Sequence, residues 1–278
     1  MFIFRDSNLR PILGGILSYI PGLYSWWDGR RPTGNSYTSA YSKSIWKYHL
    51  KNYQKFSEKH NKPKIVAEFG TGASIGSLIA ALKDDIKLVV GLDLIPYANN
   101  YCLNKKLVDE IIPFNKYPEL NKKTTLEIKN LMHSGSESAI KYFAPWTDKS
   151  IIPSEYIEFI YSHSVLEHID FPENAYREMF RILKKDGLMS HKIDHSSHKI
   201  TKSWNGHYAI NDFWWRIIRG RKPYLLNRLT PAEHKKIIIN SGFKIIHEEY
   251  VKARIDENSH TKLKDNHNIR TSVFILKK

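Results

Sequence analysis

Short apolar runs alternate along the chain with amphipathic stretches, a pattern that predicts strands separated by helices. We expect strands over residues 64–68, 88–92, 141–143, 156–161, 188–193, 243–251 and 271–277. We expect helices over residues 42–59, 74–82, 125–132 and 174–183, and a last one between the Thr230 capping box and Gly242. Prolines make the first part of 97–135 an expected irregular insertion, and 252–269 reads as a polar loop.

The first expected strand runs into a glycine-rich turn, within the sequence IVAEFGTGASIG at 65–76. Gly70 and Gly72 lack a Cβ, so the backbone can turn tightly there and approach a ligand closely. The N–H groups of the following helix start would point at that ligand. Asp93 ends the next expected strand, where nucleotide-binding folds carry the acid that holds a ribose. Together the two signals predict a nucleotide-binding α/β fold.

Glu68 gives this turn the form E-x-G-x-G, which resembles class I S-adenosylmethionine-dependent methyltransferases. The resemblance implies a Rossmann-like, seven-stranded sheet, mostly parallel with one antiparallel strand and with helices on both faces. It also implies S-adenosylmethionine as the cofactor, with Glu68 near the methionine part and an indole after the third strand stacked on the adenine. The residues expected to bind the cofactor are Glu68, Gly70, Thr71, Gly72, Ser74, Asp93, Leu94, Trp146, Thr147 and Ser162.

A narrower likeness comes from G-x-G-x-S-x-G at 70–76 followed by S-H-x-I-D at 190–194. This combination resembles a bacterial subfamily associated with surface-polysaccharide biosynthesis. It implies methyl transfer to a small-molecule or sugar hydroxyl, on a lipid- or nucleotide-linked precursor. The chain departs from that subfamily at Ser197, where an acid tends to precede His198.

A hydroxyl acceptor calls for a general base, and histidine titrates near working pH. Ligands of α/β sheets lie beyond the carboxyl ends of the strands, so the candidates follow strands four and five. They are His163, His168, His191, Asp194, His195 and His198. We predict His191 with Asp194 as the catalytic pair, because both fall at the exit of the fifth strand. Glu167 and His168 are expected to hold the loop after the fourth.

A metal centre is the alternative use of His191, Asp194, His195 and His198, since histidine and carboxylate groups are common metal ligands. Related ubiquinone-pathway methyltransferases use an E-x-x-E-H cluster, but here Ser164 takes its first position, ahead of Glu167 and His168. We therefore expect no metal.

Residues 72–76 also match G-x-S-x-G, the nucleophile elbow of α/β hydrolases, with Ser74 as nucleophile. That elbow follows several strands, whereas residues 1–63 show no period-2 strand. The cofactor turn is therefore preferred. A methyltransferase fold that only binds a partner stays a further alternative.

Composition bounds the remaining questions. The chain has 278 residues with 41% hydrophobic content, enough for one core, and we expect a helical or interfacial extension over 1–60 before a catalytic domain over 61–278. A single cysteine, Cys102, excludes an internal disulfide and suits a cytoplasmic location. Nothing in the sequence indicates an oligomeric state.

Two surface segments suggest partners. Residues 9–31 are apolar but broken by proline and glycine, so they cannot span a bilayer, yet their tryptophans and arginines suit peripheral contact with the inner face of a membrane. The alternative is a lid on the catalytic domain. Residues 213–224 interleave aromatic and basic side chains, which fits either RNA or an amphipathic helix with solvated bases. The net charge of +15 is dispersed, so nucleic acid is the less favoured partner.

Overall fold

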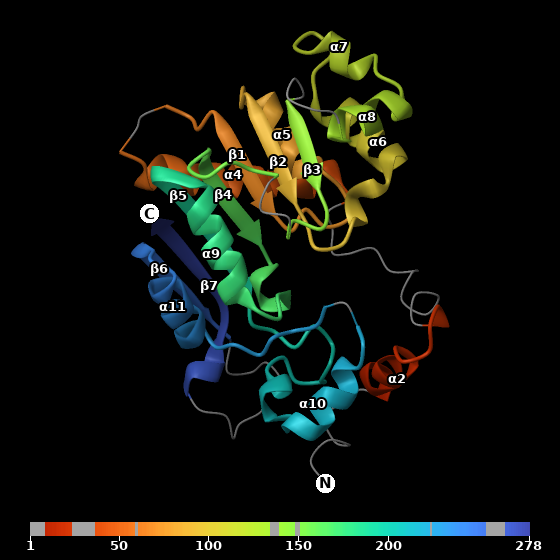
Figure 1. The fold of residues 1–278 in the computed structure, drawn as a ribbon, viewed down its shortest axis with the longest axis vertical. Coiled ribbons are helices and arrows are strands. Elements are labelled where there is room, and N and C mark those ends of the chain that lie inside the picture. The colour runs from red at the N-terminus through yellow and green to blue at the C-terminus, as the bar shows by residue number, and fades with distance from the viewer. Residues whose placement is uncertain are drawn as a thin grey trace.

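The computed structural model describes residues 9–23, 37–58, 61–133, 139–147, 151–222, 224–253 and 265–278. Its centre is one seven-stranded sheet with the strand order β3-β2-β1-β4-β5-β7-β6, and β7 is antiparallel to its neighbours (Figure 1). The strands are β1 (Ile65–Phe69), β2 (Leu88–Leu92), β3 (Ile140–Phe143), β4 (Ile157–His163), β5 (Leu183–Asp194), β6 (Lys244–Lys252) and β7 (Ile269–Lys277). All seven strands lie where the sequence predicts them, and the predicted fold class is confirmed.

The central strands are apolar because both of their faces are covered. On β1, Val66 points into one core, while Ala67 and Phe69 point into the other. Successive side chains alternate between the faces, so one short strand contributes to two cores.

The first face is covered by α4 (Ser39–Phe56), α5 (Gly76–Lys83), α6 (Tyr101–Ile111) and α8 (Thr125–His133). Trp46 of α4 is almost fully buried, and its indole N–H donates to Asp84 at 2.8 Å. This helix falls inside the predicted extension over 1–60, yet it packs on α5 and on the sheet. The second face is covered by α9 (Pro172–Ile182) and α11 (Pro231–Asn240), and the predicted capping box of Thr230 and Glu233 is present at α11.

The expectation of an irregular insertion after β2 is wrong. This part of the chain forms η1 (Tyr97–Asn99), α6 and α7 (Pro118–Asn121), and α6 and α7 lie on the β3 side of the sheet (Figure 1). Leu107 and Val108 of α6 are fully buried. Proline is tolerated at the first position of a helix, which is the place Pro118 takes in α7, so the proline did not signal a loop.

A smaller unit lies away from the sheet, where α2 (Leu9–Leu17) packs on α10 (Asp212–Arg219) (Figure 1). Gly15 allows the close approach, because a Cβ there would collide with the carbonyl of Ile217. Ile12, Ile200, Ile210, Ile218 and Leu226 form its core. Short 3-10 turns, η2 (Leu166–His168), η3 (Gly206–Ala209) and η4 (Asp265–Asn268), complete the described elements.

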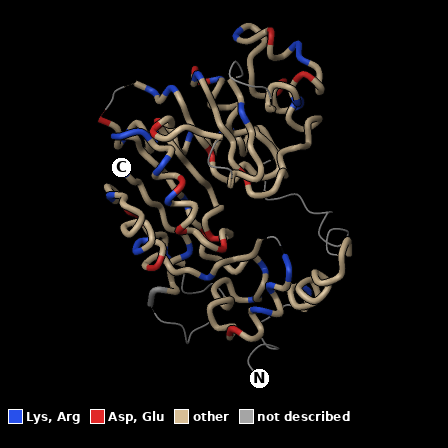
Figure 2. The backbone as a smooth tube through the Cα atoms, in the orientation of Figure 1, with Lys and Arg blue, Asp and Glu red and all other residues tan. Residues whose placement is uncertain are grey.

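This unit bears on the two predicted partner segments. Residues 213–219 do form an amphipathic helix with Ile218 buried and Arg216 exposed. Figure 2 shows Lys and Arg spread over much of the backbone rather than in one stripe. Trp26, Trp27, Arg30 and Arg31 lie outside the described residues. In the described part of the chain, no helix combines the length and the apolar character needed to cross a membrane.

Candidate active site

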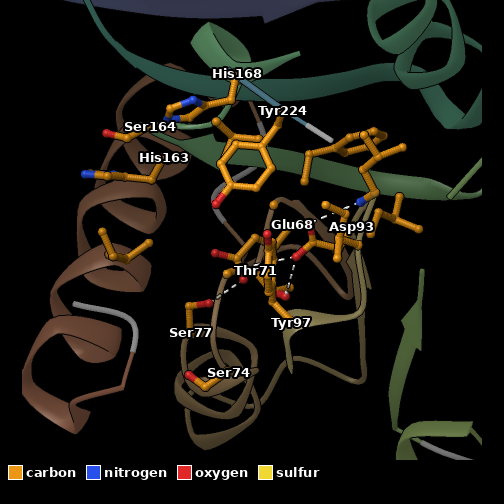
Figure 3. A pocket seen from close by; sticks show the side chains of 18 of the residues that line it. Glu68, Thr71, Ser74, Ser77, Asp93, Tyr97, His163, Ser164, His168 and Tyr224 are labelled. Atoms are coloured by element: carbon orange, nitrogen blue, oxygen red, sulfur yellow. Dashed lines mark hydrogen bonds between the residues drawn. The ribbon is translucent and has the colours of Figure 1, made fainter. Parts of the chain in front are cut away.

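A cavity of about 390 Å³ opens at the carboxyl ends of β1, β2 and β4. Figure 3 shows Glu68, Thr71 and Ser77 on one side of it, His163, Ser164 and His168 on another, and Tyr224 between them. Of the residues expected to bind the cofactor, those that line this cavity are Glu68, Gly70, Thr71, Gly72, Ser74, Asp93, Leu94 and Trp146. Thr147 and Ser162 are not part of the lining.

The glycine turn is built for close approach. Gly70 has a φ of +78° and Gly72 a φ of +70°, a backbone conformation that L side chains rarely adopt. A Cβ on Gly70 would also collide with the side chain of Val165. The Gly70 N–H donates to the Leu92 carbonyl at 2.8 Å, which ties the turn to the end of β2.

Asp93 accepts three hydrogen bonds, two of them from this turn. The Thr71 hydroxyl (3.1 Å) and the Gly72 N–H (3.2 Å) donate to Oδ2, and the Leu94 N–H (3.1 Å) donates to Oδ1. Burial outweighs these donors and raises the pKa of the Asp93 carboxyl to about 6. The carboxylate is thus held in a fixed orientation at the cavity wall, as a ribose diol would require.

Glu68 lies deeper in the same wall and is only 4% exposed. Ser77 of α5 donates a hydrogen bond to its carboxylate. Burial raises the pKa of Glu68 to about 8, with a smaller contribution from the charge of Asp93. A buried acid of this kind is stabilised in its ionised form by a nearby cation.

Trp146 follows β3 and completes the cofactor side. Its backbone N–H donates to the Asp93 carbonyl at 3.0 Å, and its ring meets Phe69 edge-on at 5.6 Å. Trp146 and the Gly70 turn therefore line one cavity, the arrangement that the resemblance implies for adenine. Thr147 is exposed and is not part of the cavity lining.

His191 does not reach the cavity. It is fully buried, with Nδ1 2.8 Å from the Ser162 hydroxyl and its ring 5.9 Å from Tyr176 of α9. Burial lowers the pKa of His191 to about 3. Ser162 and His191 are register partners on β4 and β5 and share the α9 face, so neither is placed for the role predicted from the sequence.

Asp194 is not in the lining either, but it binds a histidine that is. Its Oδ2 lies 3.3 Å from Nε2 of His198, which lines the cavity. Burial alone would raise the pKa of Asp194, but the hydrogen bonds from His198 and from the Ser196 N–H outweigh it and hold that pKa well below its usual value. His198 therefore has a carboxylate partner, although Ser197 stands before it.

Glu167, His168 and His198 form a cluster whose ligand atoms all lie within 4.8 Å of one another. Both carboxylate oxygens of Glu167 are buried without a hydrogen-bond partner among the described residues. Burial raises the pKa of Glu167 well above its ordinary value. These three side chains could hold a cation. His191 of the predicted ligand cluster is fully buried and is not part of this group.

Several lining residues were not predicted from the sequence. Tyr41, Ser42 and Ile45 come from α4. Tyr97 comes from η1 after β2, and Tyr224 comes from the segment between α10 and α11. Their positions depend on packing between distant parts of the chain, for which the sequence carries no local motif.

Comparison with known proteins bears on the family. Residues 42–248 match a family model described as a methyltransferase domain. No curated protein matches the chain. Among solved structures, an S-adenosylmethionine-dependent methyltransferase from Mesorhizobium loti is 14% identical, covers 77% of this chain and 90% of its own, and has a TM-score of 0.45. Geranyl diphosphate C-methyltransferase from Streptomyces coelicolor is 9% identical, covering 86% of this chain and 78% of its own with a TM-score of 0.47.

A third structure, phosphoethanolamine N-methyltransferase 2 from Haemonchus contortus, is 13% identical, with 88% of this chain and 58% of that chain covered and a TM-score of 0.49. Nothing about the acceptor follows from likenesses this distant. The family model, in contrast, spans most of the chain, including the glycine turn and the three candidate histidines at the cavity, His163, His168 and His198. The chain belongs to the methyltransferase domain family and is an S-adenosylmethionine-dependent methyltransferase.

Proposed function

We propose that the protein methylates a hydroxyl of a small-molecule or sugar acceptor, with a lipid- or nucleotide-linked precursor of a surface polysaccharide as the preferred class. The observation that carries this proposal is His198, a histidine that is hydrogen-bonded to Asp194 and lines the same cavity as Glu68 and Asp93. Methyl transfer to a hydroxyl needs a general base close to the cofactor, and transfer to an amine depends less on one.

The residues of the glycine turn fit the cofactor. Asp93 would accept hydrogen bonds from the ribose, Trp146 would stack on adenine, and the buried Glu68 would face the positively charged methionine part. When bound, S-adenosylmethionine would supply a sulfonium methyl group, which an acceptor oxygen takes up as S-adenosylhomocysteine leaves. The protein's share is to orient the two reactants and to exclude water.

We propose His198 as the base in place of His191. Its Nε2 is engaged by Asp194, so Nδ1 is left to take the proton of an acceptor hydroxyl. The Asp194 carboxylate favours the imidazolium that forms, and it also orients the ring. A base must also reach the bound acceptor. His198 lines the cavity, whereas His191 lies in the core.

The experiment that tests the function has two stages. Calorimetry should show binding of S-adenosylmethionine and none of NAD, and a screen of nucleotide- and lipid-linked sugars should then show methyl transfer to oxygen. Transfer to RNA, lost steeply as salt is raised, would favour the alternative acceptor instead. Cofactor binding without transfer to any acceptor class would favour a binding protein.

We further propose that the protein acts in the cytoplasm in contact with a membrane surface. Leu9, Leu13, Ile16 and Ile20, here called the α2 stripe, are each about half exposed or more and recur at helical spacing. The opposite side of α2 packs on α10, and the Arg221 guanidinium sits 5.2 Å over the Tyr19 ring beside the stripe. An apolar stripe with a cationic edge suits an anionic bilayer.

The membrane contact is tested by sedimentation with anionic vesicles. Deleting residues 1–35 should abolish binding, and the pair Leu13→Glu and Ile16→Glu should do the same with the fold intact. Leu126→Glu is the matched control, because Leu126 is also exposed but lies on α8. Vesicle binding that survives both changes would contradict the contact, and a loss of dimer instead would assign the stripe to a second copy.

A further inference from the structure

A chain of hydrogen bonds runs from α4 across β5 to the wall of the cavity. The Asn52 amide donates to Ser190 Oγ at 3.0 Å, and Ser190 Oγ lies 2.8 Å from His49 Nδ1. His49 Nε2 lies 3.1 Å from Nδ1 of His163, the last residue of β4 and part of the cavity lining. None of the roles proposed above uses His49 or His163.

The donors give this chain a direction. The Asn52 amide nitrogen can only donate, so Ser190 Oγ accepts from it. Ser190 is fully buried, and its own hydroxyl hydrogen therefore needs an acceptor. Among the described residues, the acceptor within hydrogen-bond reach is His49 Nδ1. His49 must then carry its hydrogen on Nε2 and donate it to His163 Nδ1.

Both imidazoles are neutral near pH 7. Burial, and then the neighbouring His163, lowers the pKa of His49 well below its ordinary value. Burial, and then the charge of Lys192, lowers the pKa of His163 to about 4. A neutral imidazole carries one hydrogen. Because His163 Nδ1 accepts from His49, that hydrogen sits on Nε2 of His163.

The His49 ring is also held against rotation. It stacks on Tyr161 at 4.9 Å with 26° between the planes, and Tyr48 meets it edge-on at 5.0 Å. The His49 side chain is fully buried, so no water competes for its nitrogens. A rigid donor at this point leaves His163 with one tautomer rather than a mixture.

We infer that His49 is a positioning residue that fixes His163 as the Nε2–H tautomer, so that His163 donates a hydrogen bond to an oxygen of the molecule bound in the cavity. The inference rests on the proposed function only in taking this cavity as the substrate site. The inference gives different roles to two histidines that line the cavity: His163 is a hydrogen-bond donor and His198 is the base.

Nitrogen NMR of histidine-labelled protein at pH 7 tests the tautomer without any turnover. The His163 signals, assigned with His163→Gln, should show hydrogen on Nε2. His49→Phe should shift the population toward Nδ1–H, whereas His49→Gln should restore Nε2–H, because its amide can donate to His163 while its carbonyl accepts from Ser190. The inference is overturned if wild-type His163 carries its hydrogen on Nδ1. It is also overturned if His49→Phe leaves the tautomer population of His163 unchanged.

A second measurement locates the oxygen that His163 binds. If it is the cofactor carboxylate, His163→Phe should weaken S-adenosylhomocysteine by about tenfold and leave 5′-methylthioadenosine, which lacks the amino-acid part, unchanged. If it belongs to the acceptor, both nucleosides should bind as before while the acceptor KM rises by a similar factor. Unchanged affinity for all three would show that His163 donates to neither. The tautomer result stands or falls separately from methyl transfer.

Discussion

The two sides of the cavity are built in different ways. On the cofactor side, Gly70, Gly72 and Asp93 come from two adjacent strands, and the backbone itself makes most of the contacts between them. On the acceptor side, His163 ends β4, His168 lies in η2 and His198 follows β5. Side chains orient these rings: His49 of α4 contacts His163, Asp194 binds His198, and the rings of His168 and His198 meet. The first side is a local motif, and the second is a product of packing.

This difference decides how each side responds to change. A backbone motif fails when its conformation is forbidden, and it then loses affinity for the cofactor. In a set of packed side chains, a substitution removes the role of one residue. Such a substitution lowers turnover while the cofactor still binds. Mutations on the two sides should therefore separate binding from catalysis.

The largest effect is expected on the acceptor side. His198→Gln removes the proposed base and should lower kcat by about a hundredfold or more, since general-base catalysis contributes on that order. The dissociation constant for S-adenosylmethionine, measured by calorimetry, should stay the same. Asp194→Asn should give a smaller loss, because the ring keeps a hydrogen-bond partner. An unchanged kcat in His198→Gln would mean that the base lies elsewhere in the cavity.

The next effect belongs to the cofactor side. Gly70→Ala places a Cβ at positive φ and against Val165, so the turn must move and cofactor affinity should fall by at least about tenfold. Gly22→Ala is the matched control, because Gly22 also has a φ of +78° but has open space around it. If both variants bind the cofactor equally well, close approach at Gly70 does not matter.

The sequence predicted the cofactor side well because its signals are local. A strand, a glycine turn and an acid at the next strand end are all readable within 30 residues, and this signal predicted Gly70 and Asp93, which line the cavity. Trp146 was predicted from its place after the third strand, and it lines the cavity too. The acceptor side was predicted by type of residue but not by position. From the sequence alone, His191 and His198 are equally good candidates for the base. The register of β5 against β4 is what shows that His191 faces α9.

A smaller effect is expected from pH. The pKa of Glu68 is about 8 and that of Asp93 is about 6. Between pH 6 and pH 8, Glu68 is therefore mostly protonated in the free protein. A cationic cofactor favours the carboxylate, so binding should release a proton and affinity should rise with pH, approaching about tenfold per unit below the pKa of Glu68. Calorimetry in buffers of different ionisation enthalpy measures that proton. Glu68→Gln should flatten the dependence.

The same shift has the opposite consequence for stability. The pKa of Glu68 is raised on folding, so its contribution to the free energy of unfolding is present at low pH and is lost as the pH rises through about 8. Without cofactor, Glu68→Gln should therefore gain in melting temperature over the wild type as the pH is raised. A wild type that gains stability over that range relative to Glu68→Gln would contradict the buried-acid account.

The smallest expected effect is that of a chelator, which should leave activity unchanged if His198 acts as a free base. This test matters because Glu167, whose carboxylate oxygens have no hydrogen-bond partner among the described residues, belongs to one cluster with His168 and His198, a donor set that suits a divalent cation. In the metal-free reaction, burial raises the pKa of the Glu167 carboxyl well above its ordinary value and favours the neutral acid, so Glu167→Gln should change kcat little. If EDTA abolishes activity and one divalent ion restores it, Glu167→Gln should lose that ion as well. His198 would then be a ligand rather than a base, and packing on the acceptor side would serve to assemble a metal centre.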